Sequence, residues 1–396
     1  MTDVCEGVSV GVIPEPEDKY LNVRVVEIDF HESFKTANNK ATVNAPHWPC
    51  NKYQFNYSEK PAVYRIATPA RAKVKIEVDC KGVSGSGKLI GNLQGFQFEG
   101  KMNLANGEQI VEVIMDDAPD SVRWLKGQAS WGAEGCGLSV SAGNTFVELF
   151  FVIDDPAKPK FFNARGVWAE ALRFLFENGR VSGAKDASSG AAEVTKCCFG
   201  FPYHKYEINQ GAAKFGGATR KFSLTRYMAE VDGRVNCYDQ TYAVIVFSGA
   251  LGVSVDGLFL DPFGFLNYTD IVGWGPCNNP FPNEKYMTEL RSMSGTTSGG
   301  APKPEDYLSV SPTDPDRSPF SNHMFCELSA KIYDACAGPE TGSRNRAGYA
   351  TANIDATPGL YPHPGARRAG EARDMQDYKA ILVRGGVASA EVLQVD

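Results

Sequence analysis

The sequence predicts an α+β protein in which an antiparallel β-sandwich precedes a segment of mixed helices and strands. Between about residues 18 and 153, apolar and polar residues alternate, as from Lys73 to Cys80, and glycine-rich breaks such as Asn106-Gly107 separate the runs. A linker rich in proline and charge follows at 154–160. After it, apolar residues recur at helical spacing, which is typical of a different kind of domain.

Length and charge limit the classes of function. A chain of 396 residues is expected to form two or three domains, which we place at 1–155, 161–340 and 341–396. The net charge of −7 argues against nucleic acid or an anionic membrane as a partner. No apolar run is long enough to span a bilayer, and the first residues do not resemble a secretion signal. Ten cysteines without such a signal are expected to be reduced thiols in the cytoplasm.

In the first domain we expect strands over 20–30, 73–80, 89–98, 108–115 and 145–153. The run from Gly82 to Lys88 fits most of a phosphate-binding loop, but Leu89 stands where Ser or Thr should contact magnesium, and no helix follows. We interpret it as a glycine-rich hairpin loop. His31 and His47 are isolated, whereas a metal site needs several convergent ligands, so no metal is expected there.

Two helices are expected after the linker. Residues 167–178 have apolar positions at helical spacing and end before Gly179. A second apolar run starts at Cys237 and stops at Gly252, a residue type that ends many helices. Cys237 is thus expected at a helix N-terminus, where unpaired N–H groups and the helix dipole stabilise a thiolate. Residues 185–196 are expected to be loop-like or weakly helical.

A nucleophilic cysteine needs a base, and the base needs a group that orients it. Among the five histidines, His323 lies in an expected strand, followed by a turn and a second strand that carries Asp334. Neighbouring strands can bring these side chains together, and the carboxylate then favours the imidazolium. His204 is the competing base, but its surroundings look like a loop without a partner carboxylate. We therefore predict Cys237, His323 and Asp334 as catalytic residues.

At these residues the chain resembles the transglutaminase-like superfamily of papain-like cysteine enzymes. In the family's first block a cysteine is followed two positions later by Asp, and the helix ends in Ala-Leu-Gly. Here Cys237, Asp239 and Ala250-Leu251-Gly252-Val253 occupy those positions. The resemblance covers about residues 160–340.

Two further blocks carry the same resemblance. The second block is His, an aromatic residue two later, then Glu and an aliphatic residue, matched here by His323, Phe325, Glu327 and Leu328. The third block is an Asp in a following strand, matched by Asp334. The order of the three blocks is that of the family.

The resemblance implies a transglutaminase-like core and acyl transfer through a thioester acyl-enzyme, forming or cleaving an amide bond, without a cofactor. Some members of the family need calcium, but this sequence contains no EF-hand-like run, so no obligatory metal is expected. The acyl donor would be a peptide, a protein or a small molecule, and water or an amine would accept the acyl group. A cysteine peptidase of the same fold and a non-catalytic binding or scaffold module are the alternatives.

The resemblance leaves the oxyanion donor open between the indole of Trp168 and a side-chain amide at Gln210 or Asn209. The gap between Cys237 and His323 is longer than in the family. The excess, about 268–319, is expected to be a structureless insertion that acts as a lid or substrate-selecting loop. Residues 341–396 are expected to be a loop-rich extension with closing strands at 378–383 and 392–395, and no core role is expected for them.

Overall fold

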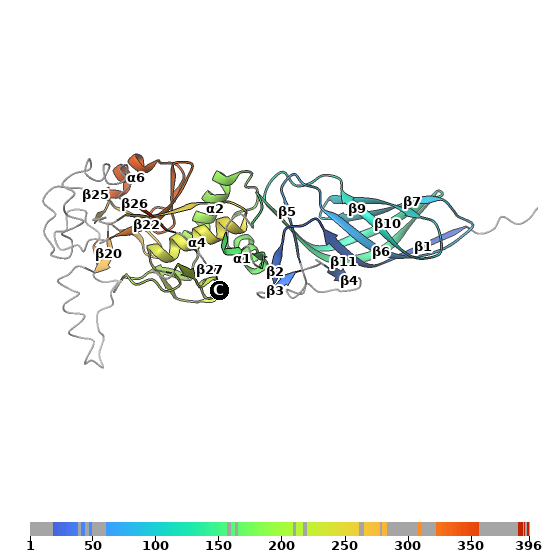
Figure 1. Ribbon diagram of the computed structural model, residues 1–396, viewed down its shortest axis with the longest axis horizontal. Helices are drawn as coiled ribbons and strands as arrows, with labels where there is room; N and C mark the ends of the chain where they lie inside the picture. The colour runs from blue at the N-terminus through green and yellow to red at the C-terminus, as the bar shows by residue number, and fades with distance from the viewer. Residues whose placement is uncertain are drawn as a thin grey trace, which may run out of the picture.

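The chain folds into two regions in a computed structural model: an elongated β-rich region and a second region of mixed helices and strands (Figure 1). The structure describes residues 19–38, 41–43, 47–49, 61–156, 160–162, 165–208, 211–216, 220–260, 265–277, 279–282, 308–309, 322–355, 387–390, 392 and 394–395. The prediction of an antiparallel β-rich part followed by a mixed part is confirmed at this level.

Nine strands of the first region form one sheet in the order β4-β1-β6-β9-β8-β7-β10-β11-β5. All neighbouring pairs are antiparallel except β11 and β5. The strands are β1 (Tyr20–His31), β4 (His47–Pro49), β5 (Ala62–Arg65), β6 (Arg71–Lys81), β7 (Ser86–Leu93), β8 (Phe96–Asn103), β9 (Gly107–Met115), β10 (Arg123–Gly135) and β11 (Leu138–Val152).

This sheet differs from the expected sandwich of two separate sheets. It curls until β1 packs against β11, so that one continuous sheet nearly closes around its own core. The bend falls between β8 and β9, which pair only near Phe98 and Met115. At the other end of these strands, the side-chain amide of Gln109 bonds both backbone groups of Asn103 at 2.9 Å.

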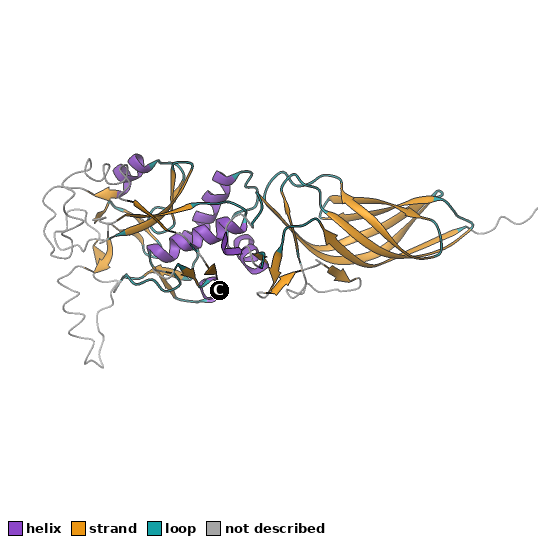
Figure 2. Ribbon diagram, in the orientation of Figure 1, coloured by secondary structure: helices purple, strands orange, loops and turns teal. Residues whose placement is uncertain are grey.

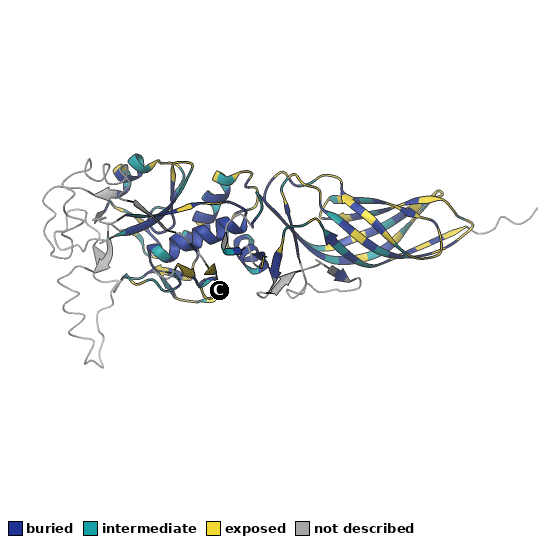
Figure 3. Cartoon of the chain, viewed as in Figure 1, coloured by how far each residue is buried: buried dark blue, intermediate teal, exposed yellow. Residues whose placement is uncertain are grey.

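Alternation sets the burial of the strands in this region. Along β6, residues from Ala72 to Cys80 point alternately inward and outward, and Val74 and Ile76 are fully buried. Exposed and buried positions therefore form stripes along the sheet (Figure 3). The expected strand at 89–98 is divided into β7 and β8 because Gln94 and Gly95, both with positive φ, form a tight turn.

The second region packs helices against a five-stranded antiparallel sheet in the order β24-β23-β22-β16-β26. These strands are β16 (Asp256–Leu260), β22 (His323–Leu328), β23 (Lys331–Asp334), β24 (Glu340–Thr341) and β26 (Val387–Ala390). The helices are α1 (Ala169–Asn178), α2 (Ala187–Gly200), α3 (Leu224–Ala229), α4 (Cys237–Ala250) and α6 (Arg346–Asn353), with a 3₁₀ turn at Lys160–Phe162. Figure 2 shows α1, α2 and α4 gathered between this sheet and the nine-stranded sheet.

Short strands complete the second region. They form the sheet β12-β2-β3 and the pairs β13-β15, β14-β27, β17-β25, β18-β19 and β20-β21. Their bounds are β2 (Thr36–Asn38), β3 (Ala41–Val43), β12 (Val167–Trp168), β13 (His204–Tyr206), β14 (Lys221–Phe222), β15 (Gly233–Val235), β17 (Phe265–Leu266), β18 (Thr269–Ile271), β19 (Gly275–Cys277), β20 (Asn279–Pro282), β21 (Leu308–Ser309), β25 (Ile354–Asp355) and β27 (Gln394–Val395).

Helix α4 is buried along nearly its whole length, and only Tyr238 is half exposed. A helix that is apolar on all sides belongs inside a core, and α4 packs against α2 on one side and β22 on the other. It begins at Cys237 and ends at Ala250, as the sequence predicts, and Gly252 follows with a φ of +78°.

Three other expectations need correction. Residues 187–200 form the regular helix α2, which begins with a capping box between Asp186 and Ser189. Within the expected structureless insertion, β18 and β19 form a hairpin beside β13, whereas 283–307 and 310–321 lie outside the described residues, and with them the lid hypothesis. Helix α6 stands where only loop was expected, and the strand expected at 378–383 lies outside the described residues.

The two regions are joined by a buried ion pair. Arg173 of α1 donates two hydrogen bonds to Glu148 of β11, at 3.0 and 2.6 Å, and the indole of Trp124 donates a third at 3.0 Å. Both charged side chains are at most 5% exposed. Each buried charge therefore has a partner, which offsets the cost of its burial. The apolar core around the helices also includes residues of the nine-stranded sheet.

Candidate active site

Cys237 is the first residue of α4. Asn236 caps the helix: its side-chain oxygen accepts the N–H groups of Tyr238 at 2.9 Å and Asp239 at 3.1 Å. Asp239 returns the contact by accepting the N–H of Asn236 at 3.2 Å. Among the described residues, none accepts a hydrogen bond from the N–H of Cys237, so this donor is available at the start of the helix.

The carboxylate of Asp239 also holds a neighbouring loop. It accepts the backbone N–H groups of Lys214, Phe215 and Gly216 at 2.7–2.9 Å. Burial raises the pKa of Asp239 above its ordinary value, although these N–H groups act in the opposite direction. An Asp two positions after the cysteine therefore has a structural role: Asp239 caps the helix and fixes the loop 214–216 beside it.

Strands β22 and β23 bring His323 and Asp334 together. Nε2 of His323 lies 2.8 Å from Oδ2 of Asp334, and both side chains are at most 1% exposed. Nε2 is engaged by the carboxylate, and a hydrogen bond with Cys237 also raises the pKa of the ring. The expected pairing of these two residues across the hairpin is confirmed; their catalytic role stays a prediction.

The electrostatics of His323 connect it to both neighbours. Burial lowers its pKa, but the charge and hydrogen bond of Asp334, and then the hydrogen bond and charge of Cys237, raise it to about 10. An imidazole held in this way is protonated at neutral pH. A positively charged ring beside the sulfur is the setting that favours a nucleophilic thiol.

Asp334 is held by more than His323. Its Oδ1 accepts the backbone N–H groups of Cys336 at 2.7 Å and Ala337 at 3.2 Å. Its Oδ2 accepts the hydroxyl of Tyr349, from α6, at 2.7 Å. Four donors on two oxygens fix the orientation of this carboxylate. Sequence reasoning missed Tyr349, although Asn345, which accepts the N–H of Gly348, was a readable helix cap.

Tyr206 is the second residue that sequence reasoning missed. It lies on β13 and is 2% exposed. Burial, the charges of Cys237, Cys336 and Asp334, and a hydrogen bond with Cys237 raise its pKa well above 10. Its hydroxyl is therefore a donor that remains protonated beside the sulfur. The alternation of His204 and Tyr206 on one short strand was the signal that could have identified it.

His204, the competing base, has no such partners. It lies among the rings of Phe201, Phe215 and Tyr227, with centroids 4.3–5.6 Å from its own. Neither ring nitrogen has a side-chain hydrogen-bond partner among the described residues, and burial lowers the pKa of His204 to about 4, against a smaller opposite effect of the Tyr227 backbone. It is a neutral core residue, as expected of a histidine packed between aromatic side chains.

The two oxyanion candidates have different outcomes. Trp168 pairs with Ala37 at the border with the first region and belongs to the buried core. Gln210 and Asn209 lie outside the described residues. The adjacent Gly211 accepts a hydrogen bond from Asn236 at 2.8 Å.

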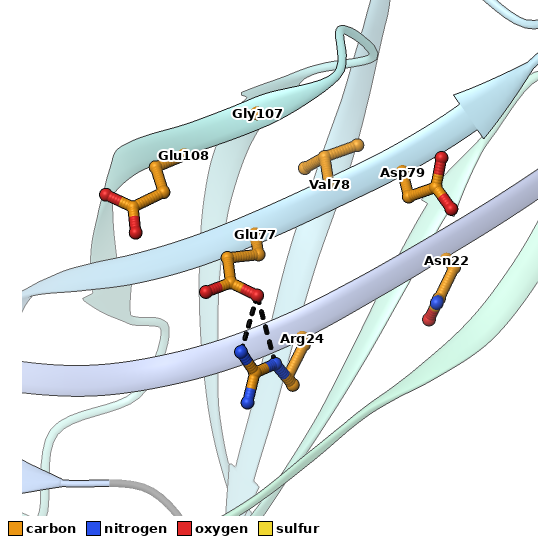
Figure 4. A pocket seen from close by; sticks show the side chains of 7 residues that line it. All are labelled: Asn22, Arg24, Glu77, Val78, Asp79, Gly107 and Glu108. Carbon is orange, nitrogen blue, oxygen red and sulfur yellow. Dashed lines mark hydrogen bonds and ion pairs between the residues drawn. The ribbon is translucent and has the colours of Figure 1, made fainter.

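Two features are absent from the described part of the chain. No group of three or more His, Cys, Asp or Glu side chains there could hold a metal ion. None of the helices there is long and apolar enough to cross a membrane. Figure 4 shows a hollow on the outer face of β1, β6 and β9, but its lining contains no Cys, His or Ser and is dominated by the ion pair between Arg24 and Glu77.

Comparison with known proteins does not assign a family. No family model matches the chain, and no curated protein matches it.

Proposed function

We propose that the chain is a cysteine-dependent acyl-transfer enzyme of the transglutaminase-like, papain-like kind. The observation that carries this proposal is the buried, hydrogen-bonded pair of His323 and Asp334 on the antiparallel sheet, whose imidazole pKa is raised further by the hydrogen bond and charge of Cys237 at the N-terminus of α4. Nucleophile, base and orienting carboxylate in that order are the parts that acyl transfer requires. The capping role of Asp239 supports the same assignment.

The chemistry proceeds in two halves. The Cys237 thiolate attacks the carbonyl carbon of an amide, ester or thioester, and a sulfur–carbon bond forms. The oxyanion accepts hydrogen bonds from the N–H of Cys237 and the hydroxyl of Tyr206. The bond to the leaving group breaks as His323 donates its proton to that group, which leaves a thioester. Water or an amine then attacks the thioester, its proton passes to His323, and the thiolate is released.

Competitive alkylation tests the proposal. Cys136 is exposed, whereas Cys237 is 3% exposed, and burial raises the pKa of Cys197, Cys198 and Cys326, so those thiols stay protonated. With iodoacetamide at about pH 7, we expect Cys237 to be modified at least about 10-fold faster than Cys136, because an ordinary thiol is only a few per cent ionised there. Peptide mass mapping gives both rates.

Two variants control the alkylation test. His323→Gln should reduce the rate at Cys237 to that of an ordinary buried thiol, and Cys136→Ala should leave the Cys237 rate unchanged. If Cys136 reacts first in the native protein, the chain is better described as a binding module. Where Cys237 is reactive, an activated acyl ester supplied with a primary amine separates transferase from hydrolase, because amide product reports the former and free acid the latter.

A further inference from the structure

We propose that helix α6 is a positioning element of this active site and that it acts through Tyr349. The inference rests on the proposed function and extends it to a segment in which no core role was expected. Tyr349 is a positioning residue, because its hydroxyl contacts Asp334 and neither Cys237 nor a reacting atom. Three sets of contacts support the proposal.

The first set concerns a single oxygen atom. Oδ2 of Asp334 accepts from His323 and also from Tyr349, at 2.8 and 2.7 Å. The other oxygen, Oδ1, is bound by backbone N–H groups. Without the phenol, the carboxylate is still attached through Oδ1 but can turn about that attachment. Tyr349 is thus the contact that holds Oδ2 in place for the histidine.

The second set of contacts gives a reason for the spacing of His323, Phe325 and Glu327 at every second position of β22. Side chains at alternate positions of a strand lie on the same face, so His323, Phe325 and Glu327 share one face of β22. The Phe325 ring packs on the Tyr349 ring with centroids 4.9 Å apart. Glu327 accepts two hydrogen bonds from Arg346, the first residue of α6, at 2.8 and 2.6 Å. Each of the three therefore engages α6 directly or through Asp334.

The third set fixes both ends of the helix. Glu340, only 3% exposed, pairs with Arg344 just before α6 and accepts a hydrogen bond from Asn353, the last residue of α6, at 3.2 Å. Tyr349 itself is fully buried. A helix held at its start, middle and end against β22, β23 and β24 keeps one buried hydroxyl at a constant distance from one carboxylate oxygen.

The test uses the pH dependence of Cys237 alkylation. The upper transition of that profile reports loss of the proton from His323. Tyr349→Phe keeps the ring and removes the hydroxyl, so the imidazolium loses part of its hold on Asp334. We expect the upper transition to move to lower pH by roughly 0.5–1 unit, the scale of one hydrogen bond. An unchanged or raised transition in the folded variant would overturn the proposal.

Tyr64→Phe is the matched control. Tyr64 is also buried, and its hydroxyl donates to the carbonyls of His31 and Arg71 in the nine-stranded sheet. It should lower thermal stability about as much as Tyr349→Phe while leaving the alkylation profile unchanged. A merely structural role for Tyr349 predicts equal effects of the two variants on the profile.

A second variant tests the helix rather than the hydroxyl. Arg346→Ala removes the bonds to Glu327 at a side chain that is 29% exposed, and we expect a shift of the same sign with Tyr349 intact. The absence of a shift in Arg346→Ala overturns the role of the helix. If Cys237 is unreactive in the native protein, the proposed function fails; if it is reactive but Tyr349→Phe matches native protein, only the present inference fails.

Discussion

The two β-rich regions of this molecule place their charged side chains in opposite ways. In the nine-stranded sheet, ion pairs such as Lys75–Glu108 and Lys88–Glu99 bridge neighbouring strands on the outer face, and the inside is apolar (Figure 3). In the five-stranded sheet, His323, Asp334 and Glu340 are buried. Because a buried charge is costly unless it is bonded, the buried charges of the five-stranded sheet depend on their hydrogen bonds, whereas the exposed charges of the nine-stranded sheet do not.

Glu148 is the exception to this pattern. Among the described residues of the nine-stranded sheet, it is the one charged side chain that is buried. Glu148→Ala leaves Arg173 buried without its carboxylate, and we expect the free energy of unfolding to fall by about 3–5 kcal/mol. Urea unfolding measures this. Glu77→Ala, which breaks an exposed pair, should change stability little. Equal losses in the two variants would remove the distinction between the regions.

The pH dependence of stability sharpens the comparison. The folded-state pKa of His323 is raised from 6.5 to about 10, so folding strengthens its hold on a proton. The resulting stabilisation is complete below about pH 6.5 and is lost as the pH rises through about 10. It is on the order of a few kcal/mol. Asp334→Asn should remove most of this dependence, as measured by unfolding at about pH 6, 8 and 10; parallel curves for the two proteins would contradict it.

The smallest expected effect concerns Tyr206. Tyr206→Phe removes a donor beside the sulfur, and we expect acyl-enzyme formation from an activated ester to slow by about 10²-fold, with little change in the concentration dependence. Mass spectrometry of the acyl adduct gives the rate. Tyr227→Phe removes another buried hydroxyl, which donates to Gln240, and should leave the rate within a few-fold of native. The oxyanion role is wrong if both variants slow the reaction equally.

Local signals account for what was predictable from the sequence. An apolar run that stops at Gly252 locates the helix of Cys237, and a hairpin places His323 against Asp334 although they are eleven positions apart. Alternation identifies the strands of the first region, but not that one sheet curls upon itself, because closure depends on β1 meeting β11.

The parts that escaped prediction depend on distant contacts. Tyr349 reaches Asp334 from a segment with few apolar residues, and the strand of Tyr206 is only three residues long. A contact between residues far apart in sequence produces no periodic pattern of apolar residues from which it could be predicted. Both residues place a hydroxyl group at the candidate site, and these contacts are visible only in the folded chain.

The end of α4 farthest from Cys237 is attached to the last residues of the nine-stranded sheet region, which restricts movement between the two regions. The carbonyl of Leu251 accepts the N–H groups of Ile153 and Asp154. A Cβ on Gly252 would overlap the backbone of Asp154. The linker therefore cannot serve as a free pivot, since its first residues are fastened to the helix that bears the nucleophile. A tilt of the large sheet would therefore be transmitted to the helix that bears Cys237.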